Sequence, residues 1–156
     1  MEIERFQLID PMEKALELAK QAGREGEVPV GAVVVYKDKI IGQGYNTKES
    51  TQLVSRHAEM IAIEQACQLL GSWRLNDCHL FVTLEPCLMC AGAIYQARFK
   101  EVTIGAKDPK AGALGSLYEI HKDQRLNHNF PVNQHKLAED CALLLKEFFR
   151  KRRVKN

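Results

Sequence analysis

The stretch Thr83–Ala93, TLEPCLMCAGA, decides how the middle of the chain folds. Its apolar start is typical of a strand end, and Pro86 suits the first turn of a helix, where the missing N–H costs nothing. Cys87 and Cys90 are three residues apart near this helix N-terminus, so their thiols are expected to lie close together. The positive end of the helix dipole favours the thiolate form there. The stretch alone leaves three interpretations open: half of a zinc site, a redox dithiol, or a pair of core cysteines.

The residues around this stretch predict an α/β fold. A strand at 79–84 leads into the cysteine helix, which runs to about 98, and a further strand follows at 101–106, so we expect a right-handed parallel crossover. Before it, β-branched runs predict a hairpin with strands at 30–36 and 40–45. Capping signals and apolar spacing predict further helices at 10–23, 55–70 and 136–153, and 130–132 is expected to form a short last strand. In the helix at 55–70, Ile61, Ile63, Ala66 and Leu70 are expected to point inward, and in the last helix Leu137, Cys141, Leu144, Leu145 and Phe148 are expected to be buried.

Length and composition predict one domain over residues 1–156, in a reducing compartment. The chain has no run of about 18 apolar residues, so we expect no membrane contact. Its N-terminus is acidic and lacks the build of a signal peptide. Five cysteines is an odd number for a disulfide framework, which favours a cytoplasmic location with free thiols.

The net charge of +2 conceals a basic C-terminus, because residues 146–156 hold six basic residues and one acidic residue. The segment Arg150–Arg153 is where this charge is densest. It suits the phosphate backbone of a nucleic acid, and equally suits a helix C-terminus that complements its own dipole.

A second candidate site segment is Arg56–Glu59, in the first turn of the helix expected at 55–70. His57 together with Cys87 and Cys90 makes a three-ligand zinc set, which leaves the fourth tetrahedral position open as in catalytic sites. Glu59 is two residues from His57, so its carboxylate can carry a proton beside the metal without being a ligand. Its place near a helix N-terminus is expected to favour the ionised form. The other histidines, expected to be at the surface or hydrogen-bonded, are His79, His121, His128 and His135.

The motif His57-x-Glu59 followed by Pro86-Cys87-x-x-Cys90 resembles the cytidine-deaminase-like zinc hydrolases. The flanking residues, including 29–33, Asn46 and 105–116, resemble the bacterial tRNA-specific adenosine deaminases within that family.

This resemblance implies a three-layer α/β/α domain with a five-stranded mixed sheet, usually in a homodimer. It implies hydrolytic conversion of the wobble adenosine in a tRNA anticodon stem-loop to inosine. One zinc ion per subunit, held by His57, Cys87 and Cys90, would generate the hydroxide that attacks C6, with Glu59 as proton shuttle. The substrate-binding residues that the resemblance implies are Val28, Pro29, Asn46, Leu84, Glu85, Pro86 and Asp108.

Several alternatives stay open at this stage. A thioredoxin-like dithiol leaves His57 and Glu59 without a role, and a binding module with structural zinc leaves Glu59 without one. A free cytosine, cytidine or guanine is the competing deaminase substrate. Glu85 is as well explained as a solvent-exposed residue at a helix start, and Cys67, Cys78 and Cys141 as inert free thiols.

Overall fold

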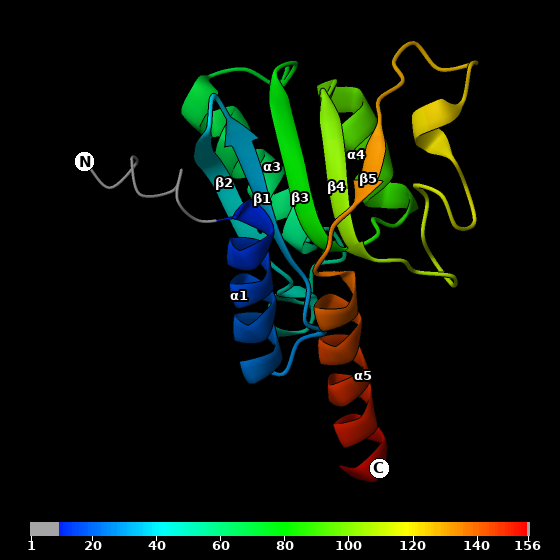
Figure 1. The fold of residues 1–156 in the computed structure, drawn as a ribbon. Coiled ribbons are helices and arrows are strands. Elements are labelled where there is room, and N and C mark those ends of the chain that lie inside the picture. The colour runs from blue at the N-terminus through cyan, green and yellow to red at the C-terminus, as the bar shows by residue number, and fades with distance from the viewer. Residues whose placement is uncertain (1–9, 156) are drawn as a thin grey trace.

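Five strands form one mixed sheet in the computed structural model, which describes residues 10–155 (Figure 1). The strands are β1 Gly31–Tyr36, β2 Lys39–Tyr45, β3 Cys78–Leu84, β4 Glu101–Ala106 and β5 Val132–Gln134, in the spatial order β2-β1-β3-β4-β5. β1 pairs antiparallel with β2 and β3, whereas β3, β4 and β5 run parallel. The predicted hairpin and the predicted parallel crossover are both confirmed.

Helices cover both faces of this sheet, which gives the three-layer α/β/α arrangement (Figure 1). α1 Pro11–Arg24 and α5 Ala138–Lys155 lie on one face, and α3 Ala58–Leu70 and α4 Leu88–Ala97 lie on the other. A single turn, α2 Lys48–Thr51, precedes α3, and a short 3₁₀ helix, η2 Ile120–Lys122, lies between β4 and β5. No helix within residues 10–155 is long and apolar enough to cross a membrane.

The hydrophobic core is divided by the sheet into two unequal parts. The larger part lies under α3 and α4 and includes Leu80, Ile94 and Phe99, and the smaller part lies under α1 and α5 around Met12 and Cys141. Of the five residues expected to be buried by the last helix, Cys141 alone is fully buried. The reason is that α5 extends beyond the sheet edge, so only its first turns pack against the sheet (Figure 1).

Glycines allow α3 to approach β2 closely. A Cβ at Gly42 would lie 2.2 Å from the carbonyl oxygen of Ala62, so no larger residue fits there. This contact fixes the distance between α3 and the sheet, and therefore the position of Ala58, the first residue of α3.

The element boundaries differ from the sequence predictions at the two segments that matter for chemistry. α3 begins at Ala58 rather than Ser55, and α4 begins at Leu88, so Pro86 lies outside the helix instead of in its first turn. Residues 46–52 contain α2 instead of being a plain loop, and the last strand begins at Val132 rather than at 130. Leu70, expected to point inward, is exposed at the end of α3, whereas Ile63 and Ala66 are buried as predicted.

Candidate active site

The N-cap residues of α3 and α4 supply two of the three candidate metal-ligating side chains. His57 caps α3 and Cys87 caps α4, both with extended backbone angles and neither with a side-chain hydrogen bond to its helix. An N-cap serine or aspartate would direct its oxygen back to the free N–H groups of the first turn. His57 and Cys87 instead direct their side chains toward each other.

These two side chains and Cys90 form a compact cluster. The Nδ1 atom of His57 lies 3.6 Å from Sγ of Cys87 and 3.5 Å from Sγ of Cys90. All three donor atoms lie within 4.8 Å of one another. One imidazole nitrogen and two sulfurs at this separation fit a tetrahedral zinc ion, which is bound at about 2.0–2.3 Å from such donors.

The charge distribution within the cluster also suits a cation. Hydrogen bonding with Cys90, and further with His57, lowers the pKa of Cys87 to about 4, whereas the same partnership raises the pKa of Cys90 far above its usual range. The hydrogen bond with Cys87 raises the pKa of His57. A thiolate is therefore present at neutral pH, and a bound metal would replace the proton that the sulfurs share.

Glu59 lies in the first turn of α3 and is buried. Burial raises the pKa of its carboxyl group to about 7, and this outweighs the hydrogen bond from its own backbone N–H, which lowers the pKa. Burial acts against the expected effect of the helix N-terminus, which favours the ionised form of Glu59. A pKa near 7 suits a group that both accepts and donates a proton.

A cavity of about 190 Å³ opens beside this cluster. Ligand sites for drug-sized molecules measure roughly 300–1,000 Å³, so this cavity suits a smaller group. The site-cavity residues are Val28, Val30, Asn46, Lys48, His57, Ala58, Glu59, Leu84, Glu85, Cys87, Asp108 and Ala111.

Five of the seven residues expected to bind substrate line this cavity, and two do not. Pro29 is fully buried and faces Gly23 of α1. Pro86 is also buried, and its carbonyl oxygen accepts a hydrogen bond of 2.8 Å from the N–H of Ala113. The cavity residues that sequence reasoning missed are Val30, Lys48, Ala58 and Ala111. The first three lie within two residues of predicted site residues, and this proximity in sequence could have indicated them.

Asn46 and Asp108 line the cavity, and the side chain of each also forms hydrogen bonds with nearby backbone groups. The Asn46 amide donates to the carbonyl oxygen of Val28 at 3.3 Å, and its oxygen accepts from the N–H of Lys48 at 3.1 Å. The Asp108 carboxylate accepts from the N–H groups of Lys110 and Ala111 at 3.1 and 3.2 Å. Both residues therefore fix the local loop as well as facing the cavity.

Glu85 is 2% exposed, so its interpretation as a solvent-exposed helix-start residue is wrong. Its side chain turns under the 107–116 loop and accepts hydrogen bonds from that loop. Burial raises the pKa of Glu85, but hydrogen bonds from Ser116, Asp108 and Leu114 outweigh it, and the net pKa is below the usual value.

The remaining histidines and cysteines lie outside the metal cluster. As expected, His79 forms a hydrogen bond with the Thr103 hydroxyl group, His128 with the carbonyl oxygen of Phe99, and His135 with the Asp10 carboxylate. The remaining thiols, of Cys67, Cys78 and Cys141, are free. Burial raises the pKa of Cys78 and of Cys141 to about 11, which makes these two unreactive.

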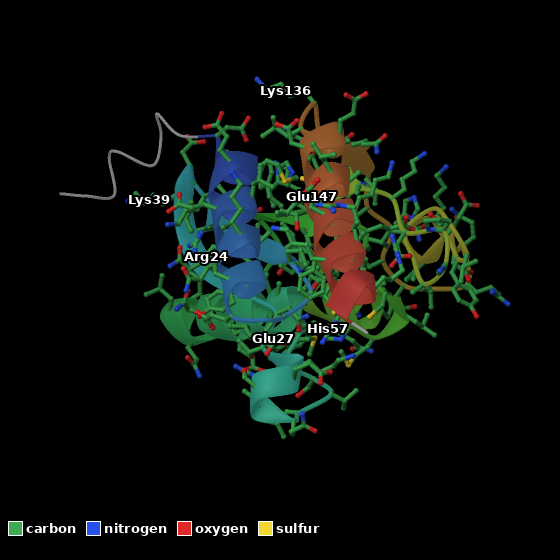
Figure 2. The ribbon with its side chains drawn as sticks, turned by 90° about the horizontal axis from the view of Figure 1, so that it is seen from below. Arg24, Glu27, Lys39, His57, Lys136 and Glu147 are labelled. Atoms are coloured by element: carbon green, nitrogen blue, oxygen red, sulfur yellow. The ribbon has the colours of Figure 1, made fainter. Side chains whose placement is uncertain are left out.

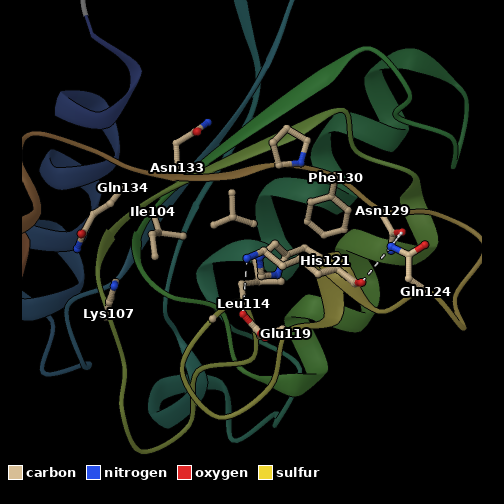
Figure 3. A pocket seen from close by; sticks show the side chains of 14 residues that line it. Ile104, Lys107, Leu114, Glu119, His121, Gln124, Asn129, Phe130, Asn133 and Gln134 are labelled. Carbon is tan, nitrogen blue, oxygen red and sulfur yellow. Dashed lines mark hydrogen bonds and ion pairs between the residues drawn. The ribbon is translucent and has the colours of Figure 1, made fainter.

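A larger cavity of about 940 Å³ lies beside β4 and β5 and contains none of the metal-cluster residues (Figure 3). It is bordered by Lys107 and by Phe130, and His121 lies at its centre in Figure 3. His121 is buried rather than superficial, and its Nδ1 atom has no hydrogen-bond partner among the described residues. Burial lowers the pKa of this imidazole, so it is neutral at physiological pH.

Comparison with known proteins identifies relatives over nearly the whole chain. The MafB19-like deaminase family matches residues 7–153, a range that includes both metal-ligand segments and the cavity walls between them. The tRNA-specific adenosine deaminase of Bacillus subtilis is 45% identical over 92% of this chain and 89% of its own length, and that of Streptococcus pyogenes serotype M1 is 46% identical over 91% and 83%.

A solved structure, from a study of A-to-I editing by tRNA:A34 deaminases at the wobble position of transfer RNA, has the same fold. It superposes with a TM-score of 0.82 at 39% identity, covering 86% of this chain and 97% of that one. The chain is therefore a deaminase of the MafB19-like family, within the group of tRNA-specific adenosine deaminases.

Proposed function

We propose that this deaminase hydrolyses the wobble adenosine of a tRNA anticodon to inosine, consuming water and releasing ammonia. The observation that carries the proposal is the cluster of His57, Cys87 and Cys90 in the same cavity as the buried Glu59. The identity of 45–46% with relatives named tRNA-specific adenosine deaminases supports it.

Zinc is the metal that we propose for the cluster, one ion per subunit. It would supply a Lewis acid that lowers the pKa of a water molecule in the cavity. Two sulfur ligands and one nitrogen ligand suit zinc, and three protein ligands leave a position for that water.

Glu59 is the proton carrier in this proposal. Its carboxyl group has a pKa of about 7, so it can take a proton from the attacking water and deliver it to a nitrogen of the purine ring. It can then pass the second proton of that water, from the new hydroxyl group at C6, to the departing amino group, which leaves as ammonia. Its burial keeps bulk water away from this transfer.

The remaining side chains of the cavity would hold the flipped base. Val28 and Leu84 offer apolar contacts, and Asn46 and Asp108 offer polar edges on facing loops. The anticodon stem-loop would be attracted by the basic end of α5, where residues 150–153 are exposed.

A product assay tests this function directly. The zinc-loaded protein is incubated with an anticodon stem-loop that carries a wobble adenosine, and separately with free adenosine, cytidine and guanine. Inosine in the stem-loop alone supports the proposal. Uridine or xanthine from the free compounds identifies a different deaminase, and no product from any of them contradicts deamination of these substrates.

We propose that the protein acts as a homodimer in the cytoplasm. Large apolar side chains are exposed near the site, namely Leu88 beside Cys87, and Leu117 and Tyr118 beyond the 107–116 loop, and a second subunit would cover them. Free thiols are compatible with a reducing compartment. Solution scattering at assay concentration should give the mass of a dimer, and the mass of a monomer would contradict the assembly.

A further inference from the structure

The carboxylate of Glu85 is fully occupied by one loop. Its Oε1 accepts from the N–H of Asp108 at 3.0 Å and from the hydroxyl of Ser116 at 2.5 Å. Its Oε2 accepts from the N–H groups of Leu114 and Ser116 at 3.1 and 2.9 Å. Two oxygens with about four lone-pair sites thus meet four donors, all from residues 107–116.

The same loop forms a wall of the active-site cavity. Asp108 and Ala111 line that cavity, whereas Leu114 and Ser116, which donate to Glu85, do not. The loop also touches the metal-ligand turn, since Ala113 N–H donates to the carbonyl of Pro86 and Gly112 pairs with Cys87 in an isolated bridge. Glu85 precedes that turn directly, so one side chain links the turn to the wall.

Gly112 shows how closely the loop rests on this carboxylate. A Cβ at Gly112 would lie 2.3 Å from both Cδ and Oε2 of Glu85, and 2.6 Å from the carbonyl oxygen of Asp108. Any larger residue at 112 would therefore displace the carboxylate or lift the loop.

We propose that Glu85 is a positioning residue: its buried carboxylate holds the 107–116 loop against the metal-ligand turn and so sets where Asp108 and Ala111 stand in the cavity wall. Glu85 also lines the cavity, but its carboxylate oxygens already accept four hydrogen bonds from the loop, so it acts on the substrate through the loop rather than by a hydrogen bond of its own. The substrate side of this inference rests on the proposed function, since it assumes that this wall meets the nucleic acid. The anchoring of the loop does not depend on that assumption.

Amide hydrogen exchange tests the anchor without reference to activity. In Glu85→Gln the side-chain NH₂ faces N–H donors, so peptides covering 108–116 should exchange at least about tenfold faster, while peptides of β3 and β4 keep their wild-type rates. Gly112→Ala should reproduce this local pattern, and Ser116→Ala, which removes one donor, should give a smaller increase. Glu119→Gln is the matched control, because Glu119 lies nearby on the surface, paired with Lys122 across 3.8 Å.

Kinetics on the stem-loop substrate tests the positioning role. With zinc content unchanged, Glu85→Gln should raise KM by about tenfold and change kcat less, because the wall binds substrate and the metal cluster is intact. A folded Glu85→Gln protein with wild-type exchange over 108–116 and wild-type KM would overturn the proposal, as would faster exchange spread evenly over the whole chain.

The two proposals fail in distinguishable ways. If wild type makes no inosine in the stem-loop, the proposed function is contradicted, while the exchange pattern still decides whether Glu85 anchors the loop. If Glu85→Gln does not fold, Gly112→Ala and Ser116→Ala carry the same test, and wild-type exchange and KM in both would overturn the anchor.

Discussion

At the scale of single residues, the proposed proton transfer by the Glu59 carboxyl group depends on its burial, which raises its pKa to about 7. Replacing Glu59 by the isosteric glutamine should leave zinc content and fold intact, because Glu59 is not one of the three candidate ligand residues. The loss of proton transfer should lower kcat by about 10²–10⁴-fold. Inosine formation and metal analysis of the same Glu59→Gln preparation check this prediction, and loss of zinc along with activity would contradict the assigned role.

Cys87 provides the corresponding prediction for metal binding. Removing one sulfur from a cluster of three donors should abolish stoichiometric zinc in Cys87→Ala, because the two remaining donors cannot complete a stable site. Cys67→Ala is a matched control, since Cys67 is a half-buried free thiol outside the cluster. Elemental analysis after gel filtration should find zinc in the control and not in the variant; full occupancy in Cys87→Ala would exclude it as a ligand.

At the scale of single elements, a second buried glutamate holds the other loop of the site. Glu27 is fully buried and accepts from the N–H groups of Glu49 and Ser50 at 2.9 and 2.7 Å. It thereby caps α2 from outside, because the N-cap residue Thr47 makes no side-chain capping bond. α2 begins two residues after Asn46, at Lys48, and both of these residues line the cavity, so this cap stabilises that part of the cavity wall.

This cap makes a prediction about stability and pH. Burial raises the pKa of Glu27, but the hydrogen bonds from Glu49 and Ser50 outweigh it, so the net pKa is below the ordinary 4.5. An acid with a lowered pKa contributes stability at pH above its unfolded value and loses that contribution as pH falls through its folded value.

Glu27→Gln should therefore lower the free energy of unfolding at pH 7 by about 1–3 kcal/mol, and by less at a pH of about 3 to 4. Urea unfolding at both pH values measures the difference. Glu17→Gln, an exposed glutamate on α1, serves as the control and should change little at either pH. A deficit in Glu27→Gln that is the same at both pH values would contradict the role of the ionised carboxylate.

The contrast between these glutamates and the metal ligands shows what sequence could predict. His57, Cys87 and Cys90 could be proposed together as ligands because each motif is local and zinc chemistry restricts the residue types, and the structure places their donor atoms within 4.8 Å of one another. The roles of Glu27 and Glu85 were missed because their donors lie 22 to 31 residues away along the chain. Hydrophobic patterning predicted β3 and β4 to within a residue. It could not predict α2, since a four-residue helix with no buried residue has no apolar signal.

At the scale of the whole molecule, the candidate metal ligands and the basic helix end lie at the same edge of the sheet. β3 and β4 end at this edge, and α5 extends past it toward the C-terminus (Figure 1). Figure 2 views the molecule from below, onto this edge, and labels His57 there. The hairpin turn at Lys37 and Asp38 lies at the opposite edge, beside the start of β3.

This arrangement gives a charge-matched test of RNA binding. Lys151→Gln/Arg153→Gln removes two exposed charges from α5, and Lys37→Gln/Lys39→Gln removes two exposed charges from the far hairpin, so both proteins have the same net charge. If phosphates bind to α5, the first double variant should bind the stem-loop more weakly. Its plot of log K against log salt should be shallower by about 0.7 for each phosphate that the replaced side chains neutralise in the wild type. The hairpin variant should keep the wild-type slope, because its charges lie far from the site. Equal slopes for both variants would mean that α5 contributes to binding only through the net charge of the protein. The phosphates of the RNA would then bind elsewhere on the active-site edge.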